Sequence, residues 1–579
     1  MSSHESSEST YEIYTHTLTE MRDLLIDLKN KDEDIHWQEK AEALEKELNS
    51  LKKNKNYWLF WKEKREEFDI KTKDSLPVLT ELTDLAITQD ATPAHVIIEG
   101  DNYHVLSVLS YTHQWQVDVI YIDPPYNTGN KDFIYNDHYV DREDSFRHSK
   151  WLSFMEKRLT LARDLMKDTG VIFISIDDNE HAQLKLLCDE VFGEDSFIGN
   201  INWKRRVSSA MADKKFSTDH EYVLCYGKIW FMFEGISKSF SGYKNPDADF
   251  RWPWISDNLT VWMGKTLRPN QFYPIIDPIT GVSYPPNPNR VWAYIPESMN
   301  RLIAENRIIF PTDPKKRPML KRFQNELKTD MNPVSSWLAE IGLNSEGSKE
   351  IQDIFWVSVF QYSKPRSLIE HLIKYSSHSN SLILDFFAGS GTTGHAVLAL
   401  NREDGGNRRF ILCSNRENTT EFPDKNICRD ITYERVRRVA TGYTNSKWVD
   451  VAWLGGNIRY LQAEFIPKHK WTDNIRNRMV ERCSEMLCLR ENIWEQMSDI
   501  STREMRFYQR GDRYLAILFW LFCFEEFSDI LRSLDRPISI YVFSRGQMTR
   551  DDFEGITVPY TVEEIPDPIL AIYKIIFWL

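Results

Sequence analysis

The sequence predicts an α/β protein whose core is one mostly parallel sheet covered by helices. Short apolar runs alternate with helical stretches from about residue 95, and the same alternation returns after about residue 365. Strands that alternate with helices are typical of a parallel sheet. Between these halves, residues 231–355 lack this rhythm and are rich in Pro, Trp, Asn and Arg. We therefore expect both halves to form one sheet, with a domain inserted between them.

The elements of this core follow from apolar periodicity. The first half predicts a strand at 95–98, a strand at 117–122, a helix at 149–167, a strand at 171–176 and a helix at 179–191. The second half predicts a helix at 367–376, a strand at 382–386, a helix at 392–401 and a strand at 409–413. Nearer the end of the chain, a strand is expected at 538–543 and an apolar helix at 568–579.

The chain has 579 residues, which is too long for a single hydrophobic core. An amphipathic pattern at 11–70 predicts helices before the core, and mixed helices and strands are expected after about residue 445. The predicted domains are a helical N-terminal arm at 1–75, the first half of the core at 76–230, the insert at 231–355, the second half of the core at 356–445 and a small α/β C-terminal domain at 446–579.

Charge is distributed unevenly along the chain. There are 72 Lys and Arg against 86 Asp and Glu, so the net charge of −14 argues against a protein that coats nucleic acid over its whole surface. Residues 241–330 differ, with 13 basic against 9 acidic residues. A basic face is therefore expected on the insert.

Neither cysteine usage nor hydropathy predicts a metal site, a disulfide framework or a membrane span. The seven cysteines include no CxxC pair and no histidines at zinc spacing. The longest apolar stretch without a charge, 514–524, is much shorter than the roughly 20 residues that cross a bilayer. No signal region opens the chain, so we expect a cytoplasmic protein with no membrane partner.

The most informative run is V-I-Y-I-D-P-P-Y at 119–126, where an apolar strand leads directly into Asp123, Pro124, Pro125 and Tyr126. Ligands of open parallel sheets bind beyond the carboxyl ends of the strands. The prolines remove backbone donors and stiffen the turn, which leaves carbonyl acceptors beside a carboxylate and an aromatic ring. This set fits an exocyclic amine such as adenine N6, held by Asp123 and the Pro124 carbonyl. Tyr126 would stack on the base, which must be flipped out of the duplex.

A second run, L-I-L-D-F-F-A-G-S-G-T-T at 382–393, leads from a strand through a glycine-rich turn into a helix. Gly389 and Gly391 permit close approach to the backbone, and the helix N-terminus favours a carboxylate. Nucleotide-binding folds share the G-x-G pattern, but no lysine follows these glycines to bind phosphates. Beside an amine pocket, the turn favours S-adenosylmethionine, with its amino-acid end near 385–391.

These motifs resemble those of the DNA amino-methyltransferases, and their order, with DPPY first and the glycine-rich turn last, is similar to that of the beta class. The flanking residues resemble the Mod subunits of type III restriction-modification systems over about 75–445. The matching runs are I-E-G-D-N (98–102), Y-I-D-P-P-Y-N-T-G-N-K-D-F-I-Y-N-D (121–137), H-S-K-W-L-S-F-M (148–155), G-V-I-F-I-S-I-D-D-N-E (170–180) and L-D-F-F-A-G-S-G-T-T-G-H-A-V (384–397). The resemblance implies a Rossmann-like S-adenosylmethionine-dependent methyltransferase core with an inserted target recognition domain.

The resemblance also implies roles for particular residues. Asp123, Pro124, Pro125 and Tyr126 match the catalytic tetrad of the family. The positions implied for the cofactor are Asp385, Phe386, Phe387, Ala388, Gly389, Ser390, Gly391, Thr392 and Thr393 in the turn, Lys364 and Pro365 before it, and Asp101 near the adenine.

Two cofactor positions have competing interpretations. An N-cap for the helix from Asn102 explains Asp101 equally well. For the ribose, the strand 409–413 ends in F-I-L-C-S and not in the expected acid, so Glu417 is a weak candidate.

The insert mixes aromatic residues, which we interpret as core, with basic residues, which we interpret as DNA contacts. The candidates are Lys265, Arg268, Arg290, Lys315, Lys316, Arg317, Lys321 and Arg322. Lys131, in the loop after DPPY, is a further candidate, although a solvated lysine is the better explanation there.

The sequence thus predicts a site-specific, adenine-specific DNA methyltransferase that uses S-adenosylmethionine, as the modification and specificity subunit of a type III system. Two alternatives stay open. One is cytosine-N4 transfer, which more often has Ser in the place of Asp123, and the other is a DNA-binding specificity subunit that is catalytically idle in a larger complex. The implied partners are double-stranded DNA, a second copy of the chain as a homodimer, and an ATP-dependent restriction (Res) subunit.

Overall fold

The computed structural model describes Trp61 and residues 75–572, with gaps at 91, 130–132, 136–137, 208–216, 314, 418–423, 468–481, 545–547, 549, 566–567 and 570–571. Except for Trp61 and Ser75, the predicted N-terminal arm lies outside the described residues, as does most of the predicted helix at 568–579.

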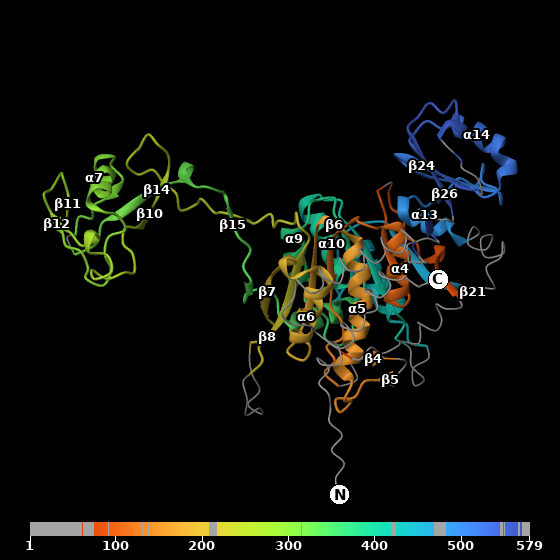
Figure 1. Ribbon diagram of the computed structural model, residues 1–579, viewed down its shortest axis with the longest axis horizontal. Coiled ribbons are helices and arrows are strands. Elements are labelled where there is room, and N and C mark those ends of the chain that lie inside the picture. Colours follow the sequence, from red (N-terminus) through yellow and green to blue (C-terminus); the bar gives the residue numbers. More distant parts are fainter. Residues whose placement is uncertain are drawn as a thin grey trace, which may run out of the picture. The chain divides into compact units, whose positions relative to one another are not determined.

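The core is a sheet of ten described strands in the order β1-β21-β2-β18-β17-β3-β6-β8-β7-β16 (Figure 1). Their bounds are β1 Ser75–Glu81, β2 His95–Glu99, β3 Val117–Ile122, β6 Met166–Ile176, β7 Phe197–Lys204, β8 His220–Gly227, β16 Trp337–Leu338, β17 Leu382–Asp385, β18 Arg409–Ser414 and β21 Ile458–Pro467. Neighbours from β21 to β6 are parallel, whereas β1 runs antiparallel to β21 and β8 runs antiparallel to β6 and β7. Because β17 pairs with β3 and β18 with β2, the predicted α/β fold with one shared sheet is confirmed.

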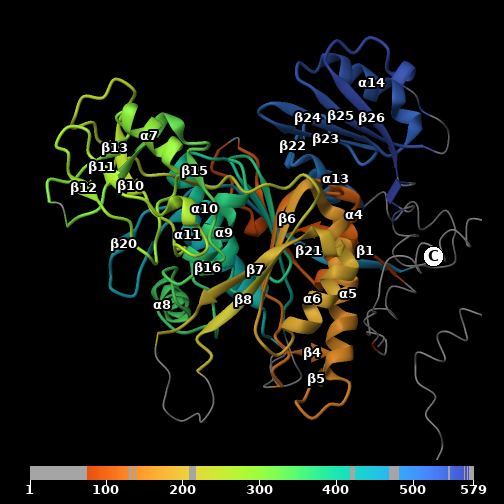
Figure 2. The same cartoon turned by 60° about the vertical axis from the view of Figure 1, so that its left-hand side comes forward.

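Helices cover both faces of this sheet (Figures 1 and 2). Helices α4, α5 and α6 lie side by side on one face, and α9, α10 and α11 cover the other. Val119 and Tyr121 of β3 share a buried cluster with Leu372 of α9 and Val397 of α10, as expected when alternate residues of a strand face one layer. The helices of the core are α4 Asn102–Thr112, α5 Arg147–Leu165, α6 His181–Phe192, α8 Asn344–Phe355, α9 Arg366–Ser376, α10 Thr392–Asp404 and α11 Glu434–Thr441.

The predicted core elements agree with these bounds to within a few residues, except for the start of β6. We expected a helix to Lys167 and a strand from Val171, but β6 begins at Met166, which pairs with Val117. The register then shifts between Val117 and Val119. Residues Lys167–Gly170, which lie outside the predicted strand, are thus part of an irregular strand.

Three elements outside the predicted halves also belong to the core. Strand β21, from the segment 446–579, lies between β1 and β2, where Ile458 and Tyr460 are buried in the main cluster. Strand β16 and helix α8, from the segment 231–355, contribute Leu338 and Ile354 to the same cluster. Each of these elements buries apolar side chains in the main cluster, and the core therefore extends beyond the predicted domain boundaries.

The rest of the insert has a small core of its own, formed by Leu259, Ile275, Trp292, Met299 and Ile308. Its elements are β9 Ile236–Ser237, β10 Trp254–Asn258, β11 Ile275–Ile276, β12 Ser283–Tyr284, α7 Pro296–Ala304, β13 Ile308–Ile309, β14 Met319–Phe323 and β15 Met331–Asn332. Strands β10, β14 and β13 form a sheet, whereas β11–β12 and β9–β15 are two-stranded.

The C-terminal part forms a second sheet, with α14 Phe524–Ser533 packed on β24. Its strands, in sheet order, are β22 Glu495–Gln496, β23 Met505–Arg510, β24 Arg513–Leu518, β25 Ile538–Phe543 and β26 Tyr560–Ile565, so the strand predicted at 538–543 is confirmed. Glu563 joins this sheet to the core through hydrogen bonds from Tyr111 of α4 and Arg490 of α13 Ser484–Glu491. The remaining pairs are β4 Ile134–Tyr135 with β5 His138–Tyr139, and β19 Tyr443–Thr444 with β20 Asp450–Val451.

Candidate active site at the carboxyl edge of the sheet

The DPPY run and the glycine-rich turn lie side by side. DPPY follows β3, the turn follows β17, and these strands are parallel neighbours in which Ile383 pairs with Val119. Parallel neighbours end at the same edge of a sheet, so two motifs that are 262 positions apart at Asp123 and Asp385 meet there.

Asp123 is the centre of a buried group of charges. Lys364 Nζ donates to its two carboxylate oxygens at 2.8 and 2.9 Å, and the Tyr126 hydroxyl donates to Oδ1 at 2.9 Å. Lys364 Nζ also donates to the Tyr126 oxygen at 2.7 Å and lies 3.4 Å from Glu221 Oε2. The side chain of Lys364, predicted to contact the cofactor, thus contacts the residues predicted to hold the target nitrogen.

Burial and charge pull the pKa values of this group in opposite directions. Burial is the largest influence on Asp123 and raises its pKa, while the neighbouring Lys364 ammonium lowers it. Burial also acts to raise the pKa of Glu221, but Lys364 and Arg205 outweigh it, so this pKa lies below its ordinary value. Burial disfavours the charged Lys364, but the two carboxylates outweigh it and raise its pKa. An ammonium between two carboxylates is thus the stable arrangement.

The two prolines present their carbonyls differently. The Pro125 carbonyl accepts a hydrogen bond at 2.7 Å from the indole of Trp151, which is fully buried in α5. Among the described residues, none donates to the Pro124 carbonyl. Trp151 therefore fixes the turn through the Pro125 carbonyl, and the Pro124 carbonyl remains as an acceptor beside Asp123.

The loop after DPPY is held by a buried carboxylate. Asn127 has a positive φ of 55°, and its side-chain amide donates to Glu180 Oε1 at 2.5 Å. The same oxygen lies 2.6 Å from His148 Nδ1 on α5. Lys131, further along this loop, lies outside the described residues. This contact anchors the start of the loop to α5 and to the residue before α6.

The glycine-rich turn is shaped by Asp385. One carboxylate oxygen accepts from the Phe387 amide at 3.0 Å and the other from the Thr393 hydroxyl at 2.5 Å. Burial raises the pKa of Asp385 to about 7, and these hydrogen bonds oppose it. Both oxygens are used inside the turn, so this carboxylate contributes by setting the shape of the backbone.

Gly389 and Gly391 have positive φ values of 47° and 76°. A Cβ on Gly391 would lie 2.9 Å from the Thr432 carbonyl oxygen, and one on Gly389 would lie 3.2 Å from the Phe360 ring. The close approach predicted for a ligand is thus already made by the protein's own residues.

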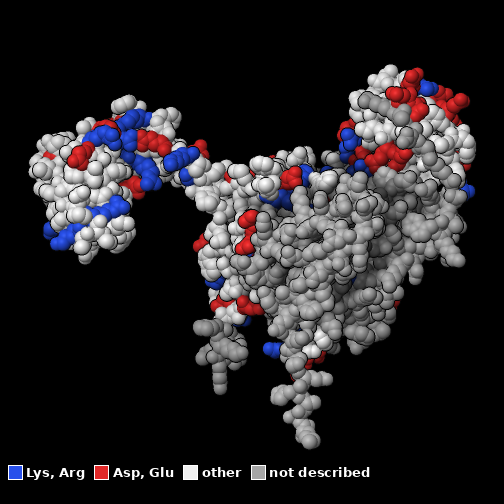
Figure 3. All heavy atoms as spheres, viewed as in Figure 1, with Lys and Arg blue, Asp and Glu red and all other residues white. Residues whose placement is uncertain are grey.

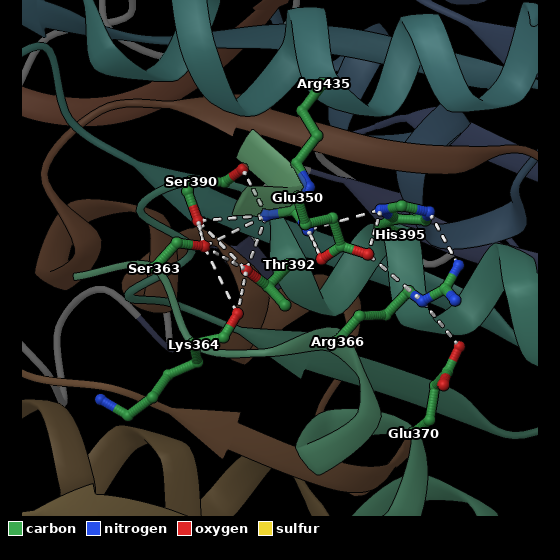
Figure 4. A network of polar contacts seen from close by, with 9 residues as sticks. All are labelled: Glu350, Ser363, Lys364, Arg366, Glu370, Ser390, Thr392, His395 and Arg435. Atoms are coloured by element: carbon green, nitrogen blue, oxygen red, sulfur yellow. Dashed lines mark hydrogen bonds and ion pairs between the residues drawn. The ribbon is translucent and has the colours of Figure 1, made fainter. Parts of the chain in front are cut away.

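A buried arginine ties this turn to the segment that carries Lys364 (Figure 4). Arg435 of α11 donates to the Thr392 hydroxyl at 2.8 Å and to Glu350 of α8 at 2.7 Å. Its guanidinium also contacts Ser363 Oγ at 3.4 Å. Figure 4 shows the Lys364 carbonyl turned toward this network and its side chain pointing away from it. Arg435 therefore connects the two predicted cofactor segments through polar contacts.

Asp101 and Glu417 are the two predicted cofactor contacts outside the glycine-rich turn and the segment of Lys364. Asp101 accepts a hydrogen bond at 2.9 Å from the amide of Tyr103, so it is the N-cap of α4, and it pairs with buried Arg158 at 3.3 Å. Its contact with a cofactor stays a prediction. Glu417 has a positive φ of 49° and lies 3.5 Å from Lys425, and its ribose contact also stays a prediction.

The basic residues of the insert are mostly exposed, and Figure 3 shows blue side chains gathered on this part of the chain with red ones among them. Lys265, Arg268, Lys315, Lys316 and Arg317 are exposed and stay predicted DNA contacts.

The remaining predicted DNA contacts of the insert are Arg290, Arg322 and Lys321. Arg290 lies over the ring of Trp262 at 4.2 Å, and Arg322 pairs with Asp257. Lys321 does not fit the prediction, because it is buried and ion-paired with Asp247, so its ammonium is already neutralised inside the insert.

The residues of this site match those of a known protein family. A family model described as DNA methylase, N6_N4_Mtase, matches residues 117–422. The chain belongs to the DNA methylase family. The matched range includes both DPPY and the glycine-rich turn, the two motifs that the fold brings together at one edge of the sheet.

The chain is also similar to individual curated proteins. It is 39% identical over 378 residues to the type III restriction-modification enzyme StyLTI Mod subunit of Salmonella typhimurium, covering 60% of this chain and 57% of that protein. It is 34% identical over 388 residues to the type II methyltransferase M.KpnI of Klebsiella pneumoniae, covering 62% of this chain and 90% of the relative. The predicted resemblance to type III Mod subunits is confirmed.

The type III relatives extend beyond the match. Besides the StyLTI subunit, the EcoP15I Mod subunit of Escherichia coli is 31% identical over 412 residues, covering 60% of this chain and 63% of that protein. The chain thus spans less than two thirds of the length of these relatives. In the part of the chain that the structure describes, no helix is long and apolar enough to cross a membrane.

Sequence reasoning missed two buried residues of this site. Glu221 is the second residue of β8, and because β8 is antiparallel to β6, its first residues lie at the edge where β3 and β6 end. An acid near the start of an antiparallel strand beside β6 is the signal that was available. Arg435 lies on a strongly amphipathic helix whose other arginines pair on the surface, so only packing identifies it.

Proposed function

We propose that this DNA methylase transfers a methyl group from S-adenosylmethionine to the exocyclic N6 of an adenine that has been flipped out of duplex DNA. The observation that carries the proposal is the pair of acceptors, the Asp123 carboxylate and the Pro124 carbonyl, at the end of β3 beside the turn that follows β17.

The chemistry of the amine explains why two acceptors are needed. The N6 lone pair is delocalised into the ring, and hydrogen bonds from both N–H groups to fixed acceptors favour a pyramidal nitrogen with an available lone pair. Asp123 and Pro124 O are such acceptors. They are held in place before the substrate arrives, so the energetic cost of orienting them has been met by folding.

Tyr126 and the loop after it form the rest of the base site. The ring of Tyr126 lies beside Asp123, and stacking of a base on an aromatic ring contributes about 1–3 kcal/mol. Such a pocket cannot reach a base inside the helix, which is why the base must leave the stack.

The residues of the glycine-rich turn fit S-adenosylmethionine. The turn lies next to the acceptors and leads into α10, a helix of 13 residues whose N-terminus favours a carboxylate, and no lysine follows the glycines. When bound, this cofactor supplies a methyl group on a positively charged sulfur. Residues 386–393, with Lys364 and Pro365, would hold it, and Asp385 maintains the backbone that does so.

We further infer that the chain acts as the modification and specificity subunit of a type III system, with the insert reading the DNA sequence. Support comes from the relatives named above and from the exposed basic residues of the insert. The inference includes a homodimer and an ATP-dependent restriction subunit as partners, both of which are named here from the resemblance to Mod subunits.

The experiment is transfer of a labelled methyl group to DNA by the purified chain, followed by digestion to nucleosides and identification of the modified base. N6-methyladenine is the expected product. N4-methylcytosine would overturn the choice of adenine, and absence of transfer in the presence of S-adenosylmethionine would favour the idle specificity subunit. The variant Asp123→Asn should abolish this transfer. Its matched control is Asp219→Asn, which changes a carboxylate that is 43% exposed and paired with Arg206 and should leave the transfer unchanged.

A further inference from the structure

The target pocket contains a second carboxylate besides Asp123. Glu221 follows His220, the first residue of β8, and its side chain is 5% exposed. One of its oxygens accepts from Arg205 at 3.1 Å, and the other faces the Tyr126 hydroxyl at 3.2 Å and Lys364 Nζ at 3.4 Å. Glu221 therefore contacts the catalytic tetrad without belonging to it.

Lys364 is shared between the two carboxylates, but unequally. Its Nζ lies 2.8 and 2.9 Å from the two oxygens of Asp123 and 2.7 Å from the Tyr126 oxygen, but 3.4 Å from Glu221 Oε2. An ion-paired N–H···O contact is ordinarily about 2.7–2.9 Å long, so the contact to Glu221 can still shorten. Lys364 thus has a close partner and a more distant one.

The target amine needs the acceptors that Lys364 occupies. Both oxygens of Asp123 accept from Lys364 Nζ, so an incoming N–H must displace the ammonium from at least one of them. The side chain of Lys364 is 8% exposed, so its charge cannot be transferred to water without a large rearrangement. Another carboxylate must therefore balance the ammonium when it leaves Asp123.

We propose that Glu221 is a positioning residue that takes over the Lys364 ammonium when the target amine binds Asp123. The proposal rests on the proposed function, because it concerns the same pocket and the same amine. During the shift the Tyr126 oxygen remains a partner of Lys364, and its single hydroxyl proton can face either carboxylate. Arg205 holds the far oxygen of Glu221, so the carboxylate stays in place to receive the lysine.

Two consequences distinguish this role from a purely structural one. Without the charge of Glu221, Lys364 remains on Asp123 and competes with the target amine, so the methylation rate falls while cofactor binding persists. Without Lys364 there is nothing to reposition, so the charge of Glu221 no longer matters. The two residues are therefore predicted to be coupled in the rate of methyl transfer.

The test is a double-mutant cycle on the full chain, measuring single-turnover methylation of DNA and calorimetric binding of S-adenosylmethionine. We expect Glu221→Gln to lower the rate about tenfold or more, with the dissociation constant for S-adenosylmethionine changed less than about twofold. In a Lys364→Met background, the same substitution should change the remaining rate less than about threefold. Asp219→Asn, two residues before Glu221 and outside the pocket, is the matched control.

Several results would overturn the proposal. An unchanged rate for Glu221→Gln in the otherwise natural chain refutes it, and so does a loss by the same factor with and without Lys364. Glu221→Asp provides a second variant if Glu221→Gln does not fold, because it keeps the charge but withdraws it from Lys364 and should also lower the rate. If the natural chain transfers no methyl group to DNA, the proposed function itself fails. If it does transfer a methyl group but the effects of the two substitutions are additive, only the proposed role of Glu221 fails.

Discussion

Gly391→Ala should weaken binding of S-adenosylmethionine by at least about 30-fold. Gly391 has a φ of 76°, a conformation that costs a residue with a Cβ about 1–2 kcal/mol. The new Cβ would also lie 2.9 Å from the Thr432 carbonyl oxygen and 3.3 Å from Thr432 Cα. These are backbone atoms of the π-helical segment Cys428–Tyr433, which cannot move alone, and relieving such overpacking costs about 1–3 kcal/mol.

Together these effects cost about 2–5 kcal/mol as long as the turn keeps its natural shape, so we expect the turn of the variant to relax. Restoring the shape that binds the cofactor would then cost up to this amount of binding free energy, and each 1.4 kcal/mol corresponds to a factor of ten in affinity. Isothermal calorimetry with S-adenosylmethionine measures the loss directly. DNA binding should change much less, because the turn does not belong to the insert.

The matched control is Gly405→Ala at the other end of the same helix. Gly405 has a φ of 70° at the C-cap of α10, but its added Cβ would meet nothing within 4 Å. This variant should lose about 1–2 kcal/mol of stability from backbone strain and should bind S-adenosylmethionine like the natural chain. If Gly391→Ala binds the cofactor as well as Gly405→Ala does, the reasoning that places the cofactor on this turn is refuted.

Asp123→Ala should abolish methylation while S-adenosylmethionine and DNA still bind; near-natural activity in the labelled-methyl assay would remove Asp123 from the reaction. Tyr126→Phe should lower the rate about 5- to 30-fold, because it keeps the stacking ring but removes a hydroxyl bonded to Lys364 and Asp123, and Tyr126→Ala should lose more; equal losses would assign the effect to the hydroxyl alone. Burial raises the pKa of Asp385 to about 7, so the folded state binds its proton more tightly than the unfolded state, and ionising it costs stability as the pH rises from about 4 to about 7. Relative to the natural chain, Asp385→Asn should therefore gain in melting temperature over this range and show a constant difference above it; a difference independent of pH between 4 and 8 would contradict the assignment. Light scattering should report a dimer at micromolar concentration, and a particle of 68.4 kDa would contradict it.

The strands and helices of the core were predictable because they depend on local patterns. An apolar run such as Val117–Ile122 is buried on both faces, and the alternation with helices implies a parallel sheet before any pairing is known. Strands β16 and β21 were harder, since the first is only two residues long and the second lies in a segment that also builds another sheet.

The candidate site was predictable to the extent that it lies in continuous motifs. Asp123–Tyr126 and the turn at 385–393 stand at strand ends, and the rule that ligands bind at the carboxyl edge of a parallel sheet brings them together. Lys321 shows the limit of this reasoning, because a basic residue in a basic segment was interpreted as a DNA contact, whereas folding buries it against Asp247. Charge counted along the chain does not distinguish a surface cation from an ion-paired one.

By itself the sequence determined the α/β core, the order of its motifs and the chemistry that those motifs suit. Only the tertiary structure decided which side chains surround Asp123. Lys364 and Glu221 come from distant segments and reach the pocket because β8 runs antiparallel to β6 and because the chain from α8 to α9 passes the glycine-rich turn. The physical reason is that secondary structure follows from side chains a few positions apart, whereas the charge balance of a buried site depends on strand pairing and packing between residues separated by hundreds of positions.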